Sequence, residues 1–120
     1  MRIGELAQRS GLSIDTVRFY EKQGLLGAAH VRRSANGYRL YTTHALERLV
    51  MIRQAQGAGF TLHEICALLA LWVRDALPDT QIVAHLEEKR QQIAARIAEL
   101  QQMEHYLAEK IRQYLGVAVP

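Results

Sequence analysis

Basic and aromatic side chains gather in two short stretches of this 120-residue sequence, residues 15–22 and residues 31–41. Arginine and lysine neutralise phosphates, arginine also bonds the edge of guanine, and tyrosine hydroxyls donate to phosphate oxygens. These residue types favour contact with a nucleic acid. The candidate contacts are Asp15, Thr16, Arg18, Phe19, Tyr20, Lys22, Arg32, Arg33, Tyr38, Arg39 and Tyr41.

The charge of the chain is divided unevenly between its two halves. Residues 1–60 carry nine Lys and Arg against four Asp and Glu, whereas residues 61–120 carry six against eight. The net charge of +3 therefore averages a first half of +5 and a second half of −2. Such a split indicates a polyanionic partner for the first half, although basic residues can also serve only to solvate a surface.

Two short helices are expected to position the first basic stretch. One runs from Ile3 to about Arg9, and Gly11 suits the left-handed residue that ends such a helix. The other occupies about residues 14–23, with Ser13 as its N-cap. Two short helices joined by a glycine-containing turn of about four residues form the helix-turn-helix pattern, which many unrelated helical pairs also show.

Side chains near the start of the second helix of a helix-turn-helix point into the major groove of DNA. In this sequence they are Asp15, Thr16, Arg18 and Phe19, with Tyr20 and Lys22 further round the helix. The sequence leaves open whether Arg18 bonds a guanine or a phosphate. It also leaves open whether Tyr20 contacts DNA or is a core aromatic with its hydroxyl at the rim.

The second basic stretch predicts a β-hairpin. Residues 31–33 and 38–41 are typical of strands, and Asn36-Gly37 is a dipeptide favoured in tight hairpin turns because it tolerates positive φ. A two-stranded hairpin is marginally stable alone, so we expect it to pack on the helices as a wing. Because Tyr38 shares a strand face with Leu40, one of the two tyrosines of the wing is expected to pack rather than to bind.

Three further helices are expected in the remainder of the chain. The first spans about residues 43–58. The second begins at Thr61, because Thr61 and Glu64 match a capping box and Phe60 and Ile65 match a hydrophobic staple, and it continues to about residue 74. The third opens at residues 78–80 and extends to residue 115, just before a glycine.

The last of these helices carries an apolar seam. From Ile93 onward its apolar residues are spaced only by threes and fours, as in a coiled coil. A helix of about 35 residues is about 52 Å long, whereas a compact chain of this length is only about 35 Å across. A symmetric homodimer is the simplest way to cover the seam, and folding of the helix back on the others is the alternative. The predicted dimer contacts are Leu86, Ile93, Ile97, Leu100, Met103, Leu107, Ile111 and Tyr114.

Four stretches, in this order and spacing, resemble the MerR family of transcription regulators along nearly the whole chain. They are IGELA at 3–7, TVRFYEKQGLL at 16–26, NGYRLY at 36–41 and GFTLHEI at 59–65. The resemblance implies a mainly α fold. It divides the chain into a winged helix-turn-helix module with a small β-hairpin wing (1–43), a two-helix connector (44–78), a long antiparallel coiled-coil dimerisation helix (79–116) and a tail (117–120). It also favours Arg39 and Tyr41 as the surest wing contacts.

The resemblance further implies a homodimeric, sequence-specific regulator without a separate effector domain. Such a protein binds a pseudo-palindromic promoter with a long spacer. It twists the DNA to realign the two promoter elements when an effector arrives, with RNA polymerase acting on the same promoter. We therefore expect a bacterial cytoplasmic protein associated with the nucleoid, and we expect no cofactor.

The sequence departs from better-understood members of the family at their sensing positions. Metal-sensing members carry cysteines near the start of the dimer helix and in a loop beyond it, but residues 76–79 and 116–120 contain none, so metal or iron–sulfur sensing is not expected. Aldehyde-sensing members have a cysteine where Ala55 stands here, and drug-sensing members append a further domain. The sequence favours Trp72 as a plain core residue; the alternative hypothesis is a small organic effector in a polar pocket around Trp72, His85 and Tyr106.

Cys66 is the single cysteine, so an intrachain disulfide and a multi-cysteine metal site are excluded and a reducing compartment is expected. It lies on or near the apolar stripe of its helix, where a cysteine usually acts as a small hydrophobe. The alternative is a thiol-based stress sensor, which requires an exposed thiol of depressed pKa.

Other classes of function are disfavoured. No nucleophile–base pair, phosphate loop or metal cluster indicates an enzyme, and acidic pairs such as Glu87-Glu88 are typical of solvated surfaces. The alternative is an architectural or excisionase-like DNA-binding accessory protein, but such proteins usually lack a long dimer helix. No apolar run approaches the roughly 18–20 residues of a membrane span, so no membrane partner is expected.

Overall fold

The structure, a computed structural model, describes residues 1–75 and 77–116, with side chains at all of these except 72–75. Contacts divide the chain into two units, residues 1–74 and the residues from Asp75 onward. The predicted helix-turn-helix module and nearly all of the connector therefore share one compact unit. The Trp72 side chain and the predicted tail at 117–120 lie outside the described residues.

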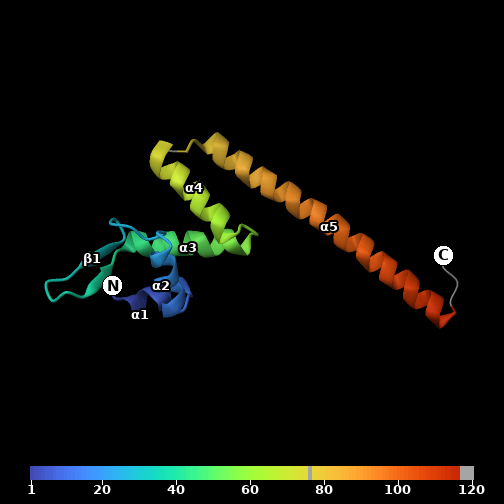
Figure 1. The fold of residues 1–120 in the computed structure, drawn as a ribbon, viewed down its shortest axis with the longest axis horizontal. Coiled ribbons are helices and arrows are strands. Elements are labelled where there is room, and N and C mark those ends of the chain that lie inside the picture. The colour runs from blue at the N-terminus through green and yellow to red at the C-terminus, as the bar shows by residue number, and fades with distance from the viewer. Residues whose placement is uncertain (76, 117–120) are drawn as a thin grey trace. The chain divides into compact units, whose positions relative to one another are not determined.

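The helix-turn-helix occupies the start of the first unit (Figure 1). Its first helix, α1 (Ile3–Ser10), ends at Gly11, whose φ of 74° is left-handed. Its second helix, α2 (Ile14–Lys22), follows Ser13, whose hydroxyl accepts a hydrogen bond from the N–H of Thr16. Both predicted caps are confirmed, and they fix the turn between the helices because each serves backbone groups that the helix leaves without partners.

The other two helices of this unit are α3 (Thr43–Gly57) and α4 (Leu62–Asp75). The predicted capping box is confirmed at the start of α4. The N–H of Thr61 donates to Oε1 of Glu64 over 3.0 Å, and the N–H of Glu64 donates to Oγ1 of Thr61 over 3.1 Å. This reciprocal pair satisfies two N–H groups that no helix carbonyl reaches, so it sets where α4 begins.

The wing is an antiparallel hairpin of β1 (Val31–Arg33) and β2 (Arg39–Tyr41). Its turn differs in detail from the expected one. The N–H of Gly37 donates to the carbonyl of Ser34 over 3.0 Å, and Gly37 has a φ of 80°. Asn36 is therefore a central residue of the turn, and Gly37 follows it as the left-handed residue that longer hairpin loops require.

The core of the first unit joins the three N-terminal helices to the base of the wing. Ile65 and Leu69 of α4 also belong to it. Burying an aliphatic or aromatic side chain fully contributes about 1.5–3 kcal/mol, so this cluster holds α2 and the wing on one support. Its buried members are Leu6, Ala7, Val17, Tyr20, Leu25, Leu26, Tyr41, Ala45, Leu49, Ile52, Ile65 and Leu69.

The second unit consists, in its described part, of the helix α5 (Asp79–Leu115), which ends at Gly116 with a φ of 73°. The 37 residues of α5 span about 55 Å at 1.5 Å per residue. None of them is buried, and the seam side chains between Ile93 and Ile111 are 44–59% exposed. The expected fold class is confirmed: mainly helical, with a two-stranded hairpin and a long C-terminal helix. Among the described residues, no helix is long and apolar enough to cross a membrane.

Candidate nucleic-acid interface

The helix α2 turns one face to solvent and the other to the core. Exposed on it are Asp15, Arg18, Phe19 and Lys22. Thr16 is half-buried, with its Oγ1 2.8 Å from Oγ of Ser13. On the inner face, Val17 and Tyr20 are 0% and 5% exposed. Packing of the inner face therefore presents nearly all of the predicted groove-facing side chains outward.

Tyr20 is the predicted contact that the structure places in the core. Its hydroxyl donates to Oε1 of Gln56 in α3 over 2.6 Å. This is the geometry of a core aromatic with its hydroxyl at the rim, one of the two alternatives that the sequence left open. The bond ties α2 to α3, and a contact of Tyr20 with DNA remains a prediction.

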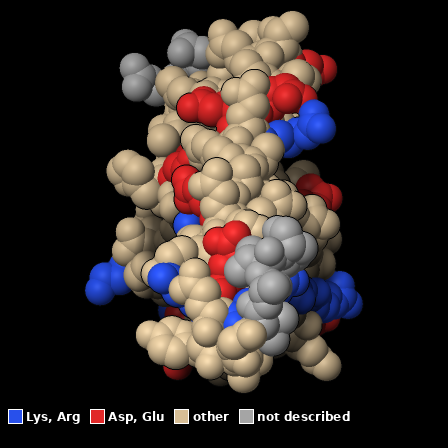
Figure 2. Space-filling view, turned by 90° about the vertical axis from the view of Figure 1, so that its right-hand side faces the viewer, with Lys and Arg blue, Asp and Glu red and all other residues tan. Residues whose placement is uncertain are grey.

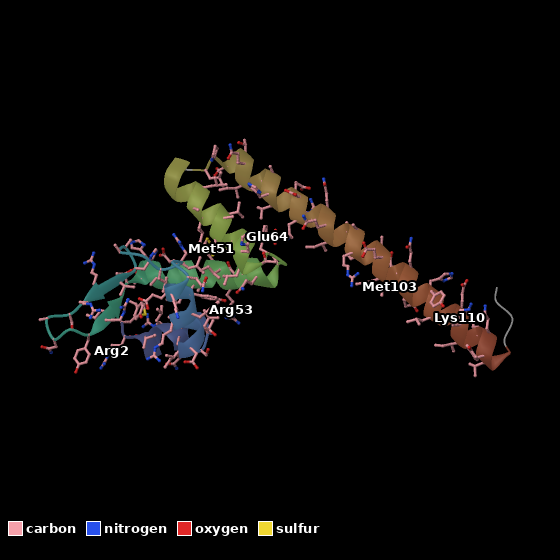
Figure 3. All side chains as sticks on the ribbon, viewed as in Figure 1. Arg2, Met51, Arg53, Glu64, Met103 and Lys110 are labelled. Atoms are coloured by element: carbon pink, nitrogen blue, oxygen red, sulfur yellow. The ribbon has the colours of Figure 1, made fainter. Side chains whose placement is uncertain are left out.

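The wing exposes its three arginines, Arg32, Arg33 and Arg39. Its two tyrosines differ in burial. Tyr38 is 51% exposed, and the guanidinium of Arg2 lies 4.3 Å from the centre of its ring (Figure 3 labels Arg2). Tyr41 is only 3% exposed, so it is the tyrosine of the wing that packs. The family resemblance favoured Tyr41 as a DNA contact, and that role remains a prediction.

Glu21, which the sequence analysis did not single out as a site residue, connects α2 to the wing. Its Oε1 accepts from Nη2 of Arg39, and its Oε2 accepts from the hydroxyl of Tyr41 over 3.0 Å. Burial and the neighbouring Glu21 raise the pKa of Tyr41, so this hydroxyl stays protonated as the donor. The sequence signal for this role was a carboxylate in the buried stripe of α2, followed by an arginine-rich hairpin that could supply its partners.

A hollow of about 380 Å³ is lined by Glu21 of α2, the loop at 26–28 and residues of both strands of the wing. Glu21, Arg32, Arg33 and Arg39 contribute to its lining. Three guanidinium groups around one carboxylate leave an excess of positive charge there, which suits an anion such as a phosphate. The face drawn in Figure 2, on another side of the molecule, carries both Lys and Arg (blue) and Asp and Glu (red) among many uncharged residues (tan).

The loop that leads into the wing is braced by His30. The imidazole Nδ1 of His30 accepts from the backbone N–H of Gly27 over 2.9 Å. The backbone N–H of His30 donates to the carbonyl of Gly27, also over 2.9 Å. Burial lowers the pKa of His30, and nearby Arg48 and His44 lower it further. Burial also lowers the pKa of Arg48, whose Nη1 donates to the carbonyl of Leu25 over 3.3 Å. The neutral imidazole is therefore the form that fits this loop.

Comparison with known proteins identifies the family. Residues 1–71 match the family described as MerR HTH family regulatory protein, and residues 46–110 match the one described as MerR, DNA binding. The chain belongs to the MerR family. It is 41% identical over 107 residues to the HTH-type transcriptional regulator ZntR of Escherichia coli K12, an alignment that covers 88% of this chain and 74% of ZntR.

Two solved structures of transcription regulators resemble this one. The transcription regulator PbrR691 from Ralstonia metallidurans CH34, in complex with Lead(II), has a TM-score of 0.77 at 37% identity and covers 93% of this chain and 85% of its own. HiNmlR, a MerR family regulator lacking the sensor domain and bound to promoter DNA, has a TM-score of 0.64 at 25% identity. The match covers 100% of this chain and 96% of HiNmlR. This MerR-family chain is therefore a DNA-binding transcription regulator, and its relatives are regulators rather than enzymes.

The residues predicted for sensing by this MerR-family chain lie in both units. Cys66 in α4 is half-buried and packs against the core of the first unit. On α5, His85 is half-buried and Tyr106 is 58% exposed. Because the predicted pocket combines α4 with α5 and includes the Trp72 side chain, it remains a prediction. Among the described residues, no group of three His, Cys, Asp or Glu is placed to hold a metal ion.

Proposed function

We propose that the chain works as a homodimer that binds a pseudo-palindromic promoter and controls transcription by distorting the promoter spacer in response to an effector. The observation that carries this proposal is the exposed face of α2 beside the three exposed arginines of the wing, all on one core. A recognition helix supplies contacts to base edges, and a basic wing supplies contacts to phosphates.

The proposed contacts divide by their position. Those assigned to the major groove are Asp15, Thr16, Arg18 and Phe19 of α2. Those assigned to phosphates are Lys22, Arg32, Arg33, Tyr38 and Arg39. Because Tyr20 and Tyr41 are buried, they are proposed to reach DNA with no more than their hydroxyl groups, which in the free protein donate to Gln56 and Glu21.

The dimer is supported by the apolar seam of α5. Six side chains of the seam are 44–59% exposed, a repeated apolar stripe of the kind that a coiled-coil partner covers. They are Ile93, Ile97, Leu100, Met103, Leu107 and Ile111. Leu86 and Tyr114, at 49% and 90% exposed, extend the stripe. A two-fold dimer would bring two copies of α2 to the two half-sites of a palindrome.

The regulatory part of the proposal involves two partners besides DNA. RNA polymerase acts on the same promoter in the cytoplasm, and a small organic effector binds around Trp72, His85 and Tyr106. A Trp72→Ala variant with an unchanged effector response would overturn the assigned pocket. A Cys66→Ser variant that loses its response to an oxidant, while the parent protein responds, would assign the signal to the thiol instead.

The test of DNA binding is footprinting on the chain's own upstream region. Protection of a dyad across a promoter spacer supports the proposal, whereas protection of one half-site, or wrapping of DNA without a promoter, favours an architectural protein.

A salt titration of DNA binding measures how many phosphates the protein neutralises. Each phosphate contact contributes about 0.9 to the slope of log K against log salt, so an Arg33→Gln dimer should lose about two such contacts. Arg96→Gln, on the surface of α5, is the matched control and should keep the parent slope.

A further inference from the structure

One carboxylate joins the recognition helix to the wing. Glu21 lies in the last turn of α2, three residues after Arg18, and its two oxygens bond two different side chains of β2. Those partners, Arg39 and Tyr41, are two residues apart, so they lie on the same face of the strand and both turn toward α2. The spacing of the strand therefore matches the two acceptor atoms of a single side chain.

The three groups differ in exposure in a way that suits contact with a ligand. The Glu21 side chain is 17% exposed and Tyr41 is 3% exposed, whereas the Arg39 side chain is 47% exposed. A guanidinium has five N–H donors in a planar fork, and the bond with Glu21 is made through Nη2. The carboxylate thus fixes one side of the guanidinium, and the 47% exposure of the Arg39 side chain leaves its outer edge accessible to a partner.

We propose that Glu21 is a positioning residue for DNA binding. Its carboxylate orients the Arg39 guanidinium so that its exposed edge faces a phosphate, and it holds the wing at a fixed distance from α2. This inference rests on the proposed function, because it assigns Arg39 to a phosphate. The expected consequence runs against simple electrostatics, since removing an acidic group near a polyanion should by itself strengthen binding.

The central experiment compares Glu21→Gln with Glu5→Gln on a duplex of the chain's own upstream region. Both variants remove one negative charge, but Glu5 pairs with Arg9 on the exposed surface of α1 and makes no bond to the wing among the described residues. Glu21→Gln is expected to raise Kd about tenfold and to lower the slope of log K against log salt by about one per protomer. Glu5→Gln is expected to bind as tightly as the parent or slightly tighter. Equal or tighter binding by Glu21→Gln overturns the proposal.

A second pair of variants tests the proposal without altering Glu21. Arg39→Lys keeps the positive charge but lacks the planar fork that a carboxylate orients, so it should bind more weakly than the parent, though less weakly than Arg39→Gln. Parent-like binding by Arg39→Lys overturns the positioning role, even where Glu21→Gln folds poorly. In the double variant, Glu21→Gln should add no further loss to Arg39→Gln, and additive losses also overturn the proposal. Failure of the parent protein to protect DNA would instead remove the proposed function.

Discussion

Nη1 of Arg53 in α3 donates to the carbonyl oxygen of Ser10 over 3.3 Å, at the C-terminal end of α1 (Figure 3 labels Arg53). The last carbonyls of a helix lack partners within it and carry the negative end of its dipole. A guanidinium there both supplies a hydrogen-bond donor and interacts favourably with the dipole. The same guanidinium lies against Gly11, the residue at which the chain leaves α1. α3 thereby supports the turn of the helix-turn-helix.

Gly11→Ala is expected to destabilise the protein. Gly11 has a φ of 74°, which costs other residues about 1–2 kcal/mol, and a Cβ there would lie 2.4 Å from Nη1 of Arg53. We expect a loss of about 2 kcal/mol in the free energy of unfolding, measured by urea denaturation. Gly4→Ala is the control, because Gly4 is a helical residue with nothing within 4 Å of the added Cβ. That change should stabilise by about 0.5–1 kcal/mol, and an equal loss in both variants would contradict the explanation.

Tyr20→Phe tests whether the hydroxyl of this residue stabilises the fold without changing the salt dependence of DNA binding. Loss of the 2.6 Å bond to Gln56 should lower the free energy of unfolding by about 0.5–1.5 kcal/mol. The salt slope of DNA binding should stay unchanged, because a neutral hydroxyl releases no counterion. Tyr38→Phe, at a ring that is 51% exposed, should leave the stability at the parent value. Parent-like stability of Tyr20→Phe would show that the bond to Gln56 contributes nothing.

Acid is expected to weaken the fold through His30. The pKa of His30 is lowered from its ordinary value of 6.5 in the folded chain, so the unfolded chain takes up this proton first as the pH falls. The free energy of unfolding should therefore decrease below about pH 6.5, by at most about 1.4 kcal/mol per pH unit from this group, and be unaffected by it above that pH. Protonation also removes the acceptor that serves Gly27.

Measuring stability between pH 5 and 7.5 checks this prediction. His30→Gln should show a flatter pH dependence than the parent, because glutamine can accept from Gly27 without titrating. His63→Gln, at an exposed position of α4, should retain the parent dependence. Identical pH profiles for His30→Gln and the parent would assign the acid sensitivity to other groups.

Ile97→Glu should dissociate the proposed dimer. Ile97 lies in the seam of α5 and is 51% exposed in the single chain. Two copies of this isoleucine would be lost from a two-fold interface, at about 1.5–3 kcal/mol each when fully buried, so the dimer should weaken about 100-fold or more. Sedimentation equilibrium measures the change. Gln101→Glu, an exposed position outside the seam, should remain as dimeric as the parent. A parent protein that is monomeric at high concentration would contradict the dimer itself.

The helix ends could be predicted because their signals are local. Gly11, Ser13 and the Thr61–Glu64 pair each act within four residues, and the structure shows each in its predicted role. The position of the wing turn could be predicted only approximately. A glycine signals a left-handed residue, but it does not indicate whether that residue lies inside the turn or follows it.

The contacts that build the interface lie between distant residues and were not predictable. The bond from Tyr20 to Gln56 spans 36 residues, and the pair of Glu21 with Arg39 spans 18. Strand alternation separates Tyr38 from Tyr41, but packing of the hairpin on α2 decides that Tyr41 is the buried one. Residue types indicated which side chains serve the site, whereas tertiary packing determines which of them are free to do so.

Tyr20 and Glu21 are consecutive residues of α2, and they bond to opposite supports. Successive residues of a helix point about 100° apart, and here one reaches α3 while the next reaches β2. α2 therefore cannot roll about its own axis without breaking one of these bonds. We therefore expect α2 and the wing to keep their relative orientation when they meet a ligand, because Glu21 ties the helix to β2 while Tyr20 ties it to α3.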